Sequence, residues 1–344
     1  MNDSAADAAT REQVLQRLRA DSVFVLATHE GPDGDALGSL VGMHGLLRHL
    51  GKDSEIFIAP EDLPLPLEYR LFELDNLIQT PPQDIARRTV VFLDCGNIDR
   101  NSASVLRDGA HLINIDHHHD NTRFGTLNYV QPLASCTAEI VWDLAHDLEV
   151  RITPQVAEAL YVGLITDTGR FMYENTSARA HVMAAELIEA GVDVPGVYRR
   201  LYEEVPPEKL ALLALALSKV QRYDDGEITL ASLDAEDFAR VGAEEAYSEG
   251  IIDHLRAVAG TKVAVLVREL TGGERRGQRK ASLRATDDEV DVSVIARAQG
   301  GGGHRRAAGF TTALAPQELI AFLRASVQAQ LHVPAGEQPA VAPA

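Results

Sequence analysis

Three short apolar runs, each ending at or close to an aspartate, are the feature that most constrains the fold of this chain. Residues 23–28 (VFVLAT), 89–94 (TVVFLD) and 111–116 (HLINID) have the length and composition of buried strands. Apolar residues at helical spacing follow the first run over 37–50, and Gly51 is placed to end that helix. Strands that alternate with helices predict an α/β fold with a mostly parallel sheet and helices on both of its faces.

At 344 residues, the chain is long enough for two domains. The segment VPPEKLALLALALSKVQRY has a proline pair followed by an apolar helix, which suits a linker. After it, the strand-like runs EITLASLD, TKVAVLVREL and RKASLRAT are separated by glycine-rich or charged turns. We therefore predict an N-terminal domain over 15–200, a linker helix over 201–224, a smaller C-terminal α/β domain over 225–328 and a disordered tail over 329–344.

The composition limits the partners of the chain. Its formal net charge of −19 provides no long-range attraction to duplex nucleic acid. Residues 262–306 stand out from the rest, with ten Lys and Arg residues against six Asp and Glu residues. No apolar run approaches the roughly 18 residues of a membrane helix, and the N-terminus has no signal-peptide pattern. Because Cys95 and Cys136 form no metal or disulfide motif, a cytoplasmic protein with reduced thiols and no membrane partner is the simplest expectation.

Acidic residues follow several of the predicted strands. Asp33 and Asp35 come shortly after the first strand, and Asp94 and Asp116 end two others. Ligands of open α/β sheets bind at the carboxyl ends of the strands, so these side chains are expected to meet at one edge. Crowded carboxylates repel one another, and a divalent cation relieves that repulsion. Taken alone, however, the PDGD segment is also ordinary turn chemistry.

Histidines beside these acids narrow the choice of metal. His29 precedes Asp33, and the DHHH segment places three histidines beginning directly after Asp116. Mixed carboxylate and imidazole ligands suit Mn²⁺, Fe²⁺, Co²⁺ or Zn²⁺ better than Mg²⁺ or Ca²⁺. The GLITDTGRF segment adds Asp167, so there are enough ligands for two metals, and an acid such as Asp94 could bridge them. Two metals at such a site suit phosphoester hydrolysis.

In this order, the pattern resembles the motifs of the DHH phosphoesterase superfamily. The residues that carry the resemblance are His29-x3-Asp33-x-Asp35, Asp94, Asp116-His117-His118 and Asp167. The GGGGHRRAAGF run at 300–310 resembles the glycine-rich motif of the associated C-terminal substrate-binding domain. The resemblance extends over about residues 15–328 and points to the bacterial group of nanoRNases and pAp phosphatases. The resemblance implies that the N-terminal domain binds the metals and carries out catalysis.

The resemblance also implies roles for single residues and two Mn²⁺ ions as cofactors, with other divalent metals possible. One metal would be held by His29, Asp33 and Asp94, and the other by Asp35, Asp94, His117 and Asp167. The catalytic residues would be His118, which faces the scissile phosphate, Asp116, which orients the histidines, and the bridging Asp94. We expect His119 to be a bystander, because adjacent side chains cannot all face one site.

The glycine-rich run of the second domain has a physical rationale of its own. Four consecutive glycines let backbone N–H groups approach a phosphate, although such a run alone is more often a flexible turn. Positive charge stands beside the run, and arginine can clamp a phosphate or stack on a base. Of the adjacent Arg305 and Arg306, one is expected to point to solvent. The predicted substrate-binding residues are Arg284, Gly302, Gly303, His304 and Arg305.

These features predict a two-metal phosphoesterase that hydrolyses short oligoribonucleotides to mononucleotides, the 3′-phosphate of pAp, or both. Its partners would be short single-stranded RNA or small nucleotides, and a homodimer is possible. One alternative is a pApA or cyclic di-AMP phosphodiesterase. Another is a RecJ-like single-strand DNA exonuclease, which is less favoured because the sequence has no evident additional nucleic-acid-binding domain. The glycine-rich motif argues against a type II pyrophosphatase. A nucleotide-binding regulator is the non-enzymatic alternative, and the complete ligand set argues against it.

Overall fold

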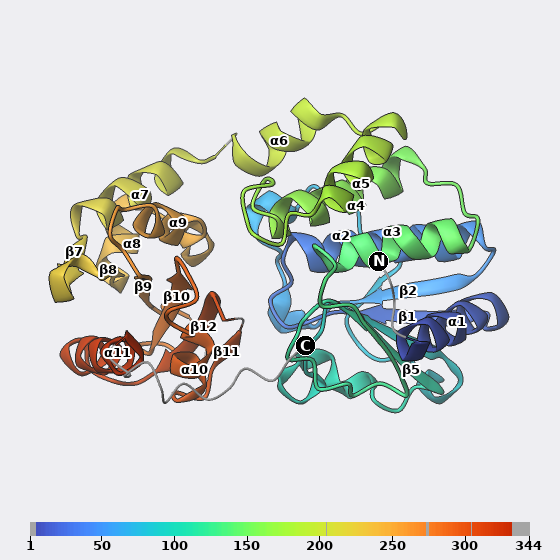
Figure 1. Cartoon of the computed structure of the whole chain (residues 1–344), viewed down its shortest axis with the longest axis horizontal. Coiled ribbons are helices and arrows are strands. Elements are labelled where there is room, and N and C mark those ends of the chain that lie inside the picture. The colour runs from blue at the N-terminus through green and yellow to red at the C-terminus, as the bar shows by residue number, and fades with distance from the viewer. Residues whose placement is uncertain (1–4, 204, 273–274, 304, 332–344) are drawn as a thin grey trace. The chain divides into compact units, whose positions relative to one another are not determined.

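The computed structural model describes residues 5–203, 205–272, 275–303 and 305–331. The chain forms two compact units, Met1–Glu204 and Val205–Ala344. Each unit has its own sheet and its own apolar cores (Figure 1). Within the described ranges, no helix combines the length and the apolar character that a membrane span requires.

A parallel sheet organises the first unit. In the part of the chain that the structure describes, six strands pair in the order β3-β2-β1-β4-β5-β6, and all neighbouring pairs are parallel. The strands are β1 (Val23–Ala27), β2 (Asp53–Phe57), β3 (Leu77–Ile78), β4 (Thr89–Leu93), β5 (His111–Asp116) and β6 (Leu127–Val130). The predicted α/β class and parallel sheet are therefore confirmed.

Both faces of this sheet are buried, by different kinds of helix. Alternate residues of β1 face opposite sides, so Leu26 packs among the α-helices and Val25 in the core on the other face. That other face is covered by the short 3₁₀ helices Ile98–Arg100 and Ser102–Leu106. The α-helices of the first unit are α1 (Ala5–Ala20), α2 (Gly34–His49), α3 (Thr137–Asp147), α4 (Pro154–Asp167), α5 (Ala178–Glu189) and α6 (Val194–Tyr202).

The second unit is a mixed sheet between two layers of helices. Its strand order is β11-β12-β10-β9-β8-β7, in which only the β8–β9 pair is parallel among the described pairs. The strands are β7 (Gln221–Tyr223), β8 (Ile228–Leu233), β9 (Val263–Glu269), β10 (Arg279–Ala285), β11 (Gly302–Gly303) and β12 (Ala307–Thr312). The α-helices are α7 (Pro207–Ser218), α8 (Ala235–Val241), α9 (Ile251–Arg256), α10 (Val292–Arg297) and α11 (Pro316–Leu331). Helices α7–α9 contribute to one core and α10 and α11 to the other.

The helix of the predicted linker, α7, packs within the second unit. Its Leu212 and Ala216 are fully buried in one core with Phe238 of α8 and Leu255 of α9. The predicted domain limits and the roles assigned to them stay predictions. Of the predicted tail, residues 329–331 complete α11, and the remainder lies outside the described residues.

Candidate metal centre

Neighbouring strands bring the predicted site residues to one edge of the parallel sheet. β1, β4 and β5 are adjacent and in register, with Ala27 opposite Phe92 and Leu93 opposite Ile115. Residues at or shortly after the carboxyl ends of these strands therefore lie at the same edge. These residues are His29, Asp33, Asp94, Asp116, His117 and His118.

Imidazole and carboxylate side chains form three overlapping groups at this edge. Within each group, one ligand atom of every residue lies within 4.8 Å of the others. The groups are His29, Asp33 and Asp94; Asp94, His117 and His118; and Asp35, His117 and Asp167. Asp94 and His117 each belong to two groups and so join them into one cluster. The structure thus gathers every residue predicted to hold metal, while their role as ligands stays a prediction.

Asp94 lies at the centre of this cluster. His29 Nε2 is 3.5 Å from Asp94 Oδ2, and His117 Nε2 is 3.7 Å from Asp94 Oδ1. His117 Nε2 also lies 3.7 Å from Asp167 Oδ2. The Asp94 side chain is only 3% exposed. The two oxygens of one buried carboxylate therefore face histidines of different groups, which is what a shared metal ligand requires.

Hydrogen bonds hold the backbone at Asp94 in an unusual conformation. Its φ of 58° is left-handed, which residues other than glycine rarely adopt. The side-chain amides of Asn114 and Asn121 donate to the carbonyl of Cys95 at 2.9 and 3.1 Å. The N–H of Asp94 itself donates to the carbonyl of Ile115 at 3.1 Å. These contacts fix the turn that places Asp94 after β4.

Glycines on α2 let α4 approach closely. A Cβ on Gly38 would lie only 2.4 Å from the carbonyl oxygen of Ala159, and one on Gly34 would clash with the last turn of α4. The start of α2 therefore lies beside the end of α4, with the two helices antiparallel. This packing brings Asp35 in the first turn of α2 and Asp167 at the end of α4 into the same group.

Asp33 has a structural role as well as a place in the cluster. It is the N-cap of α2, and its Oδ1 accepts hydrogen bonds from the N–H groups of Asp35 and Ala36 at 3.0 and 3.1 Å. Desolvation of the carboxylate opposes its ionisation, but the contacts with His29 outweigh this effect. The hydrogen bond and charge of His29 hold the pKa of Asp33 below its ordinary value. The turn interpretation therefore holds for this residue, and its role as a metal ligand stays a prediction.

Two other carboxylates of the cluster have raised pKa values. Burial and the charges of Asp94 and Asp167 raise the pKa of Asp35 well above its ordinary value. Desolvation raises the pKa of Asp167 to about 6; His117 opposes this rise, and the charges of Asp94 and Asp33 add to it. The cluster thus holds more negative charge than its histidines balance. A divalent cation supplies the missing positive charge, so these residues fit a metal.

Asp116 holds two neighbouring histidines. Its Oδ1 lies 2.7 Å from His118 Nδ1 and accepts the backbone N–H of His117 at 2.8 Å. The other oxygen accepts a hydrogen bond from Asn121. Burial lowers the pKa of His118, but the hydrogen bond and charge of Asp116 prevail and raise it to about 10. His119 is exposed and belongs to none of the three groups.

Two polar contacts of the cluster were not expected from the sequence. The hydroxyl of Thr137 donates to Asp94 Oδ1 at 3.0 Å, and Asn175 Nδ2 donates to Asp167 Oδ2 at 2.9 Å. Thr137 is the first residue of α3, and no local pattern in that helix signals a partner 43 positions earlier in the chain. Asn175 lies only eight residues after Asp167 in the sequence. This short separation was the one sequence signal that the two side chains could be in contact.

The predicted substrate-binding residues of the second unit differ in their surroundings. Among the residues that the structure describes, Arg284 on β10 forms no ion pair, and its Nη1 donates to a backbone carbonyl at 3.1 Å. Arg305 and Arg306 instead share one acid, because their Nε atoms lie 3.4 and 3.0 Å from Asp288 Oδ1. His304 lies outside the described residues.

The glycine-rich run has a structural explanation of its own. Gly302 and Gly303 form β11 and pair with β12. A Cβ on Gly303, whose φ is 130°, would lie 2.5 Å from the carbonyl oxygen of Ala307. A Cβ on Gly301 would lie 2.2 Å from that of Gly309. Close backbone approach therefore requires glycine here, and phosphate binding by the run stays a prediction.

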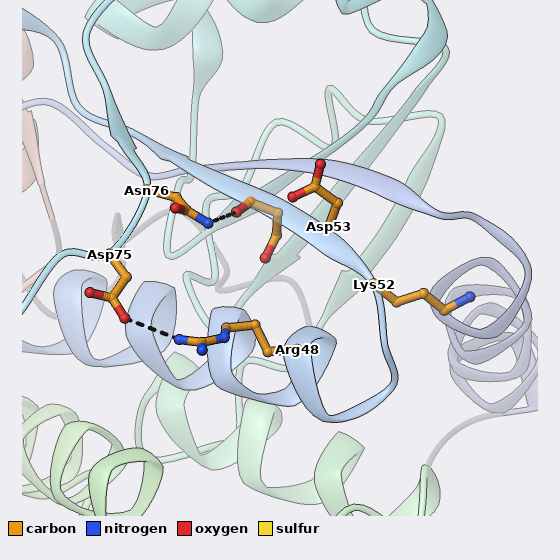
Figure 2. Close-up of a pocket in the computed structure, with 6 residues that line it drawn as sticks. Arg48, Lys52, Asp53, Asp75 and Asn76 are labelled. Atoms are coloured by element: carbon orange, nitrogen blue, oxygen red, sulfur yellow. Dashed lines mark hydrogen bonds and ion pairs between the residues drawn. The ribbon is translucent and has the colours of Figure 1, made fainter.

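A separate polar pocket of about 340 Å³ lies at the opposite, amino edge of the parallel sheet (Figure 2). It is lined by Arg48, Lys52, Asp53, Ser54, Asp75 and Asn76. Arg48 pairs with Asp75 at 3.0 Å, and Lys52 donates to the carbonyl of Arg19. The lining therefore has two basic side chains and two acidic ones, Asp53 and Asp75, so it presents no excess of positive charge to an anionic ligand.

The parallel sheet with a linked carboxylate and imidazole cluster defines a class, and both units match known domains. Residues 23–164 match the DHH family, N-terminal domain, and residues 235–331 match the DHHA1 domain. The first match contains every residue of the cluster except Asp167. The chain belongs to the DHH family.

Within this family, the chain is similar to particular proteins. It is 36% identical over 303 residues to the bifunctional oligoribonuclease and PAP phosphatase NrnA of Thermus thermophilus, which covers 87% of each chain. It is 26% identical over 305 residues to NrnA of Bacillus subtilis, covering 87% of this chain and 92% of that protein. An exopolyphosphatase-related protein from Bacteroides fragilis superposes with a TM-score of 0.81 and 22% identity, over 94% of this chain and 96% of the other. At this identity the structural likeness supports the fold alone.

Proposed function

We propose that this protein is a metal-dependent hydrolase that cleaves short oligoribonucleotides to mononucleotides and removes the 3′-phosphate of pAp. The observation that carries this proposal is the joined cluster in which Asp94 and His117 each belong to two ligand groups. Relatives that align along most of the chain are named bifunctional oligoribonucleases and PAP phosphatases, which supports this pair of substrates. The reaction is the hydrolysis of phosphoester bonds.

The cluster fits two divalent cations, which we take to be Mn²⁺. Its mixture of imidazole nitrogen and carboxylate oxygen suits that ion, and the raised pKa values of Asp35 and Asp167 indicate a need for positive charge. One cation would be held by His29, Asp33 and Asp94, and the other by Asp35, Asp94, His117 and Asp167. When bound, such a pair activates water and stabilises the charge that develops on the phosphate.

His118 is proposed to face the scissile phosphate. Asp116 fixes the orientation of the imidazole through Nδ1, and its hydrogen bond and charge raise the pKa of His118 and so favour the protonated ring. A positively charged imidazole at this position attracts an anionic phosphate. His118 would thus position and neutralise the phosphate, while Asp116 acts by holding His118.

The second unit is proposed to bind the end of the nucleotide. Arg284, Gly302, Gly303, His304 and Arg305 are the proposed contacts. The absence of an acidic partner for Arg284 among the described residues supports its use for phosphate. Arg305, in contrast, would have to exchange Asp288 for the substrate.

The cellular setting is part of the same proposal. Short single-stranded substrates suit an acidic chain whose excess of basic residues is confined to 262–306. The proposed location is the cytoplasm, where such nucleotides arise. A homodimer is proposed as well, and light scattering of the purified protein would test it.

Hydrolysis of four substrates in parallel with Mn²⁺ tests the proposed function. The substrates are a 5′-labelled RNA dinucleotide, a longer RNA, pAp and cyclic di-AMP, and Asp94→Ala is the matched inactive control. We expect hydrolysis of the dinucleotide and of pAp, with the activity lost in the variant. Preference for cyclic di-AMP would favour the phosphodiesterase alternative. Failure on all four by folded, Mn²⁺-loaded protein would contradict the proposal and favour a nucleotide-binding regulator.

A further inference from the structure

Backbone groups at the start of α3 hold one of the proposed metal ligands. The N–H groups of Thr137 and Ala138 donate to the two oxygens of Asp35 at 2.7 and 2.9 Å. Slightly earlier in the chain, the carbonyl of Ala134 lies 3.4 Å from His117 Nδ1. Residues 134–138, here called the α3 junction, therefore contact two members of the Asp35, Asp94, His117 and Asp167 set.

The side chain of Thr137 reaches a third member of this set. Thr137 is fully buried, and its hydroxyl donates to Asp94 Oδ1 at 3.0 Å. The same oxygen faces His117, whereas the other oxygen of Asp94 faces His29. The hydroxyl therefore limits the rotation of the Asp94 carboxylate, and it does so at the oxygen that faces His117.

Asn175 connects the α3 junction to the fourth member. Its Nδ2 lies 2.8 Å from the carbonyl oxygen of Ser135 and 2.9 Å from Asp167 Oδ2. One amide group therefore links the α3 junction to a carboxylate that arrives from the end of α4. All four members of the set are held by this junction, either directly or through Asn175.

The α3 junction is itself firmly held. The N–H of Ser135 donates to Glu139 Oε2 at 2.9 Å, and Glu139 is 1% exposed. Arg179 lies 3.3 Å from the other oxygen of Glu139 and balances its charge. In the part of the chain that the structure describes, no hydrogen bond joins the α3 junction to His29 or Asp33. Apart from the shared Asp94, the support is thus confined to one side of the cluster.

We propose that the α3 junction sets the affinity of one metal-binding position, the one formed by Asp35, Asp94, His117 and Asp167. The junction acts on this position through Thr137 and Asn175. The position of His29, Asp33 and Asp94 would depend on it less, because the α3 junction reaches that position only through the shared Asp94. This inference rests on the two-metal site of the proposed function. Thr137 and Asn175 are positioning residues, because they act by orienting carboxylates and are assigned no contact with substrate.

Titration of the full-length protein with Mn²⁺, followed by the electron paramagnetic resonance signal of free Mn²⁺, tests this inference. Thr137→Val removes the hydroxyl and keeps the branched shape, whereas Thr137→Ser keeps the hydroxyl. We expect Thr137→Val and Asn175→Ala each to weaken one of two binding steps by about 10–100-fold and to change the other much less. Thr137→Ser should bind both ions as the wild type does. Thr229→Val, at a buried threonine of the second unit bonded to Thr261, is the matched control and should change neither step.

Three results would overturn the inference. The first is wild-type affinity at both positions in Thr137→Val and Asn175→Ala. The second is an equal loss at both positions with a lowered melting temperature, which would show a general structural role. The third is a wild-type protein that binds fewer than two Mn²⁺ ions. Because the titration needs no substrate, a protein that binds two ions selectively but hydrolyses none of the four nucleotides would contradict the proposed function and leave this inference standing.

Discussion

At the scale of single residues, chemically identical side chains of one cluster behave differently because their neighbours differ. Burial opposes the ionisation of Asp33, but the neighbouring His29 outweighs it and lowers the pKa of Asp33. Asp35 is buried among other carboxylates, so its pKa is raised. Asp167 follows Asp35 in this respect, with a pKa of about 6. All three residues are aspartates, so the differences between their pKa values come from their surroundings in the folded protein.

The raised pKa of His118 predicts how the stability of the metal-free protein depends on pH. In EDTA, the folded-state pKa of about 10 exceeds the ordinary value of 6.5, so the folded state binds this proton more tightly than the unfolded state does. The resulting stabilisation is complete below pH 6.5 and is lost as pH rises through about 10. We therefore expect the melting temperature of the chelator-treated protein to fall across this interval. His118→Gln should flatten the fall, and an equal fall in wild type and variant would contradict the prediction.

At the scale of elements, the packing of α2 against α4 decides whether the cluster forms. Gly38 lies against the backbone of α4, and this close contact places Asp35 beside Asp167. The glycines of α2 recur at or near every fourth position, as GDALGSLVGMHG shows. This spacing puts them on one helix face, and it was an available sequence signal for a close helix neighbour.

Replacement of Gly38 tests the role of this contact. Gly38→Ala places a methyl group 2.4 Å from the Ala159 carbonyl oxygen, which cannot move without displacing α4. We expect the free energy of unfolding to fall by about 1–3 kcal/mol, together with weaker Mn²⁺ binding, measured by urea denaturation and by titration. Gly272→Ala, where a methyl group meets nothing within 4 Å, is the control and should leave both unchanged. Unchanged stability of Gly38→Ala would show that α4 yields without cost.

Prediction of elements from the sequence succeeded where apolar periodicity was strong. The strands at 23–28, 89–94 and 111–116 and the helix over 37–50 are present, with limits shifted by a few residues. In contrast, α1, β6 and α6 were not predicted from the sequence. α1 has a polar composition, and β6 is only four residues long, so neither has a distinctive pattern of its own. Their burial comes from tertiary contacts with the first unit.

At the scale of the whole molecule, part of the excess of basic residues over 262–306 is paired within the second unit. Lys262 contacts Asp287 and Glu289 at 2.9 and 2.7 Å. Arg305 and Arg306 share Asp288. Exposed pairs of this kind contribute little to stability, but they reduce the positive charge that a substrate meets. Arg284 is therefore the arginine of the predicted set whose charge is not balanced by a described ion pair.

Replacement of Arg284 tests its proposed contact with nucleotide. If its guanidinium holds a substrate phosphate, Arg284→Ala should raise KM for pAp by about 10–100-fold with a much smaller change in kcat. Mn²⁺ affinity should stay at the wild-type value. Arg297→Ala, at an exposed arginine of α10, serves as the control. Equal KM values for the wild type and Arg284→Ala would remove Arg284 from the proposed contacts.

Metal removal tests the charge balance of the whole cluster. Mn²⁺ at about 100 times its Kd should stabilise the protein by about 2.7 kcal/mol for each ion that binds the folded state alone. For a unit of this size, this corresponds to a rise of roughly 5–10 °C in melting temperature per ion. EDTA should reverse the rise, and Asp94→Ala should abolish most of it. An equal rise in Asp94→Ala would place the stabilising ion elsewhere.

The sequence by itself determined the α/β class, the parallel strands and the motif residues, because strand alternation and the spacing of His29, Asp33 and Asp94 are local patterns. It also carried the resemblance to the family that the comparisons then established. Only the tertiary structure decided which neighbouring side chains and backbone atoms form hydrogen bonds with those motif residues. Thr137 meets Asp35 across 102 positions, and Asn114 and Asn121 fix a turn made by another strand. Such contacts depend on how separate elements pack, and no local pattern encodes them.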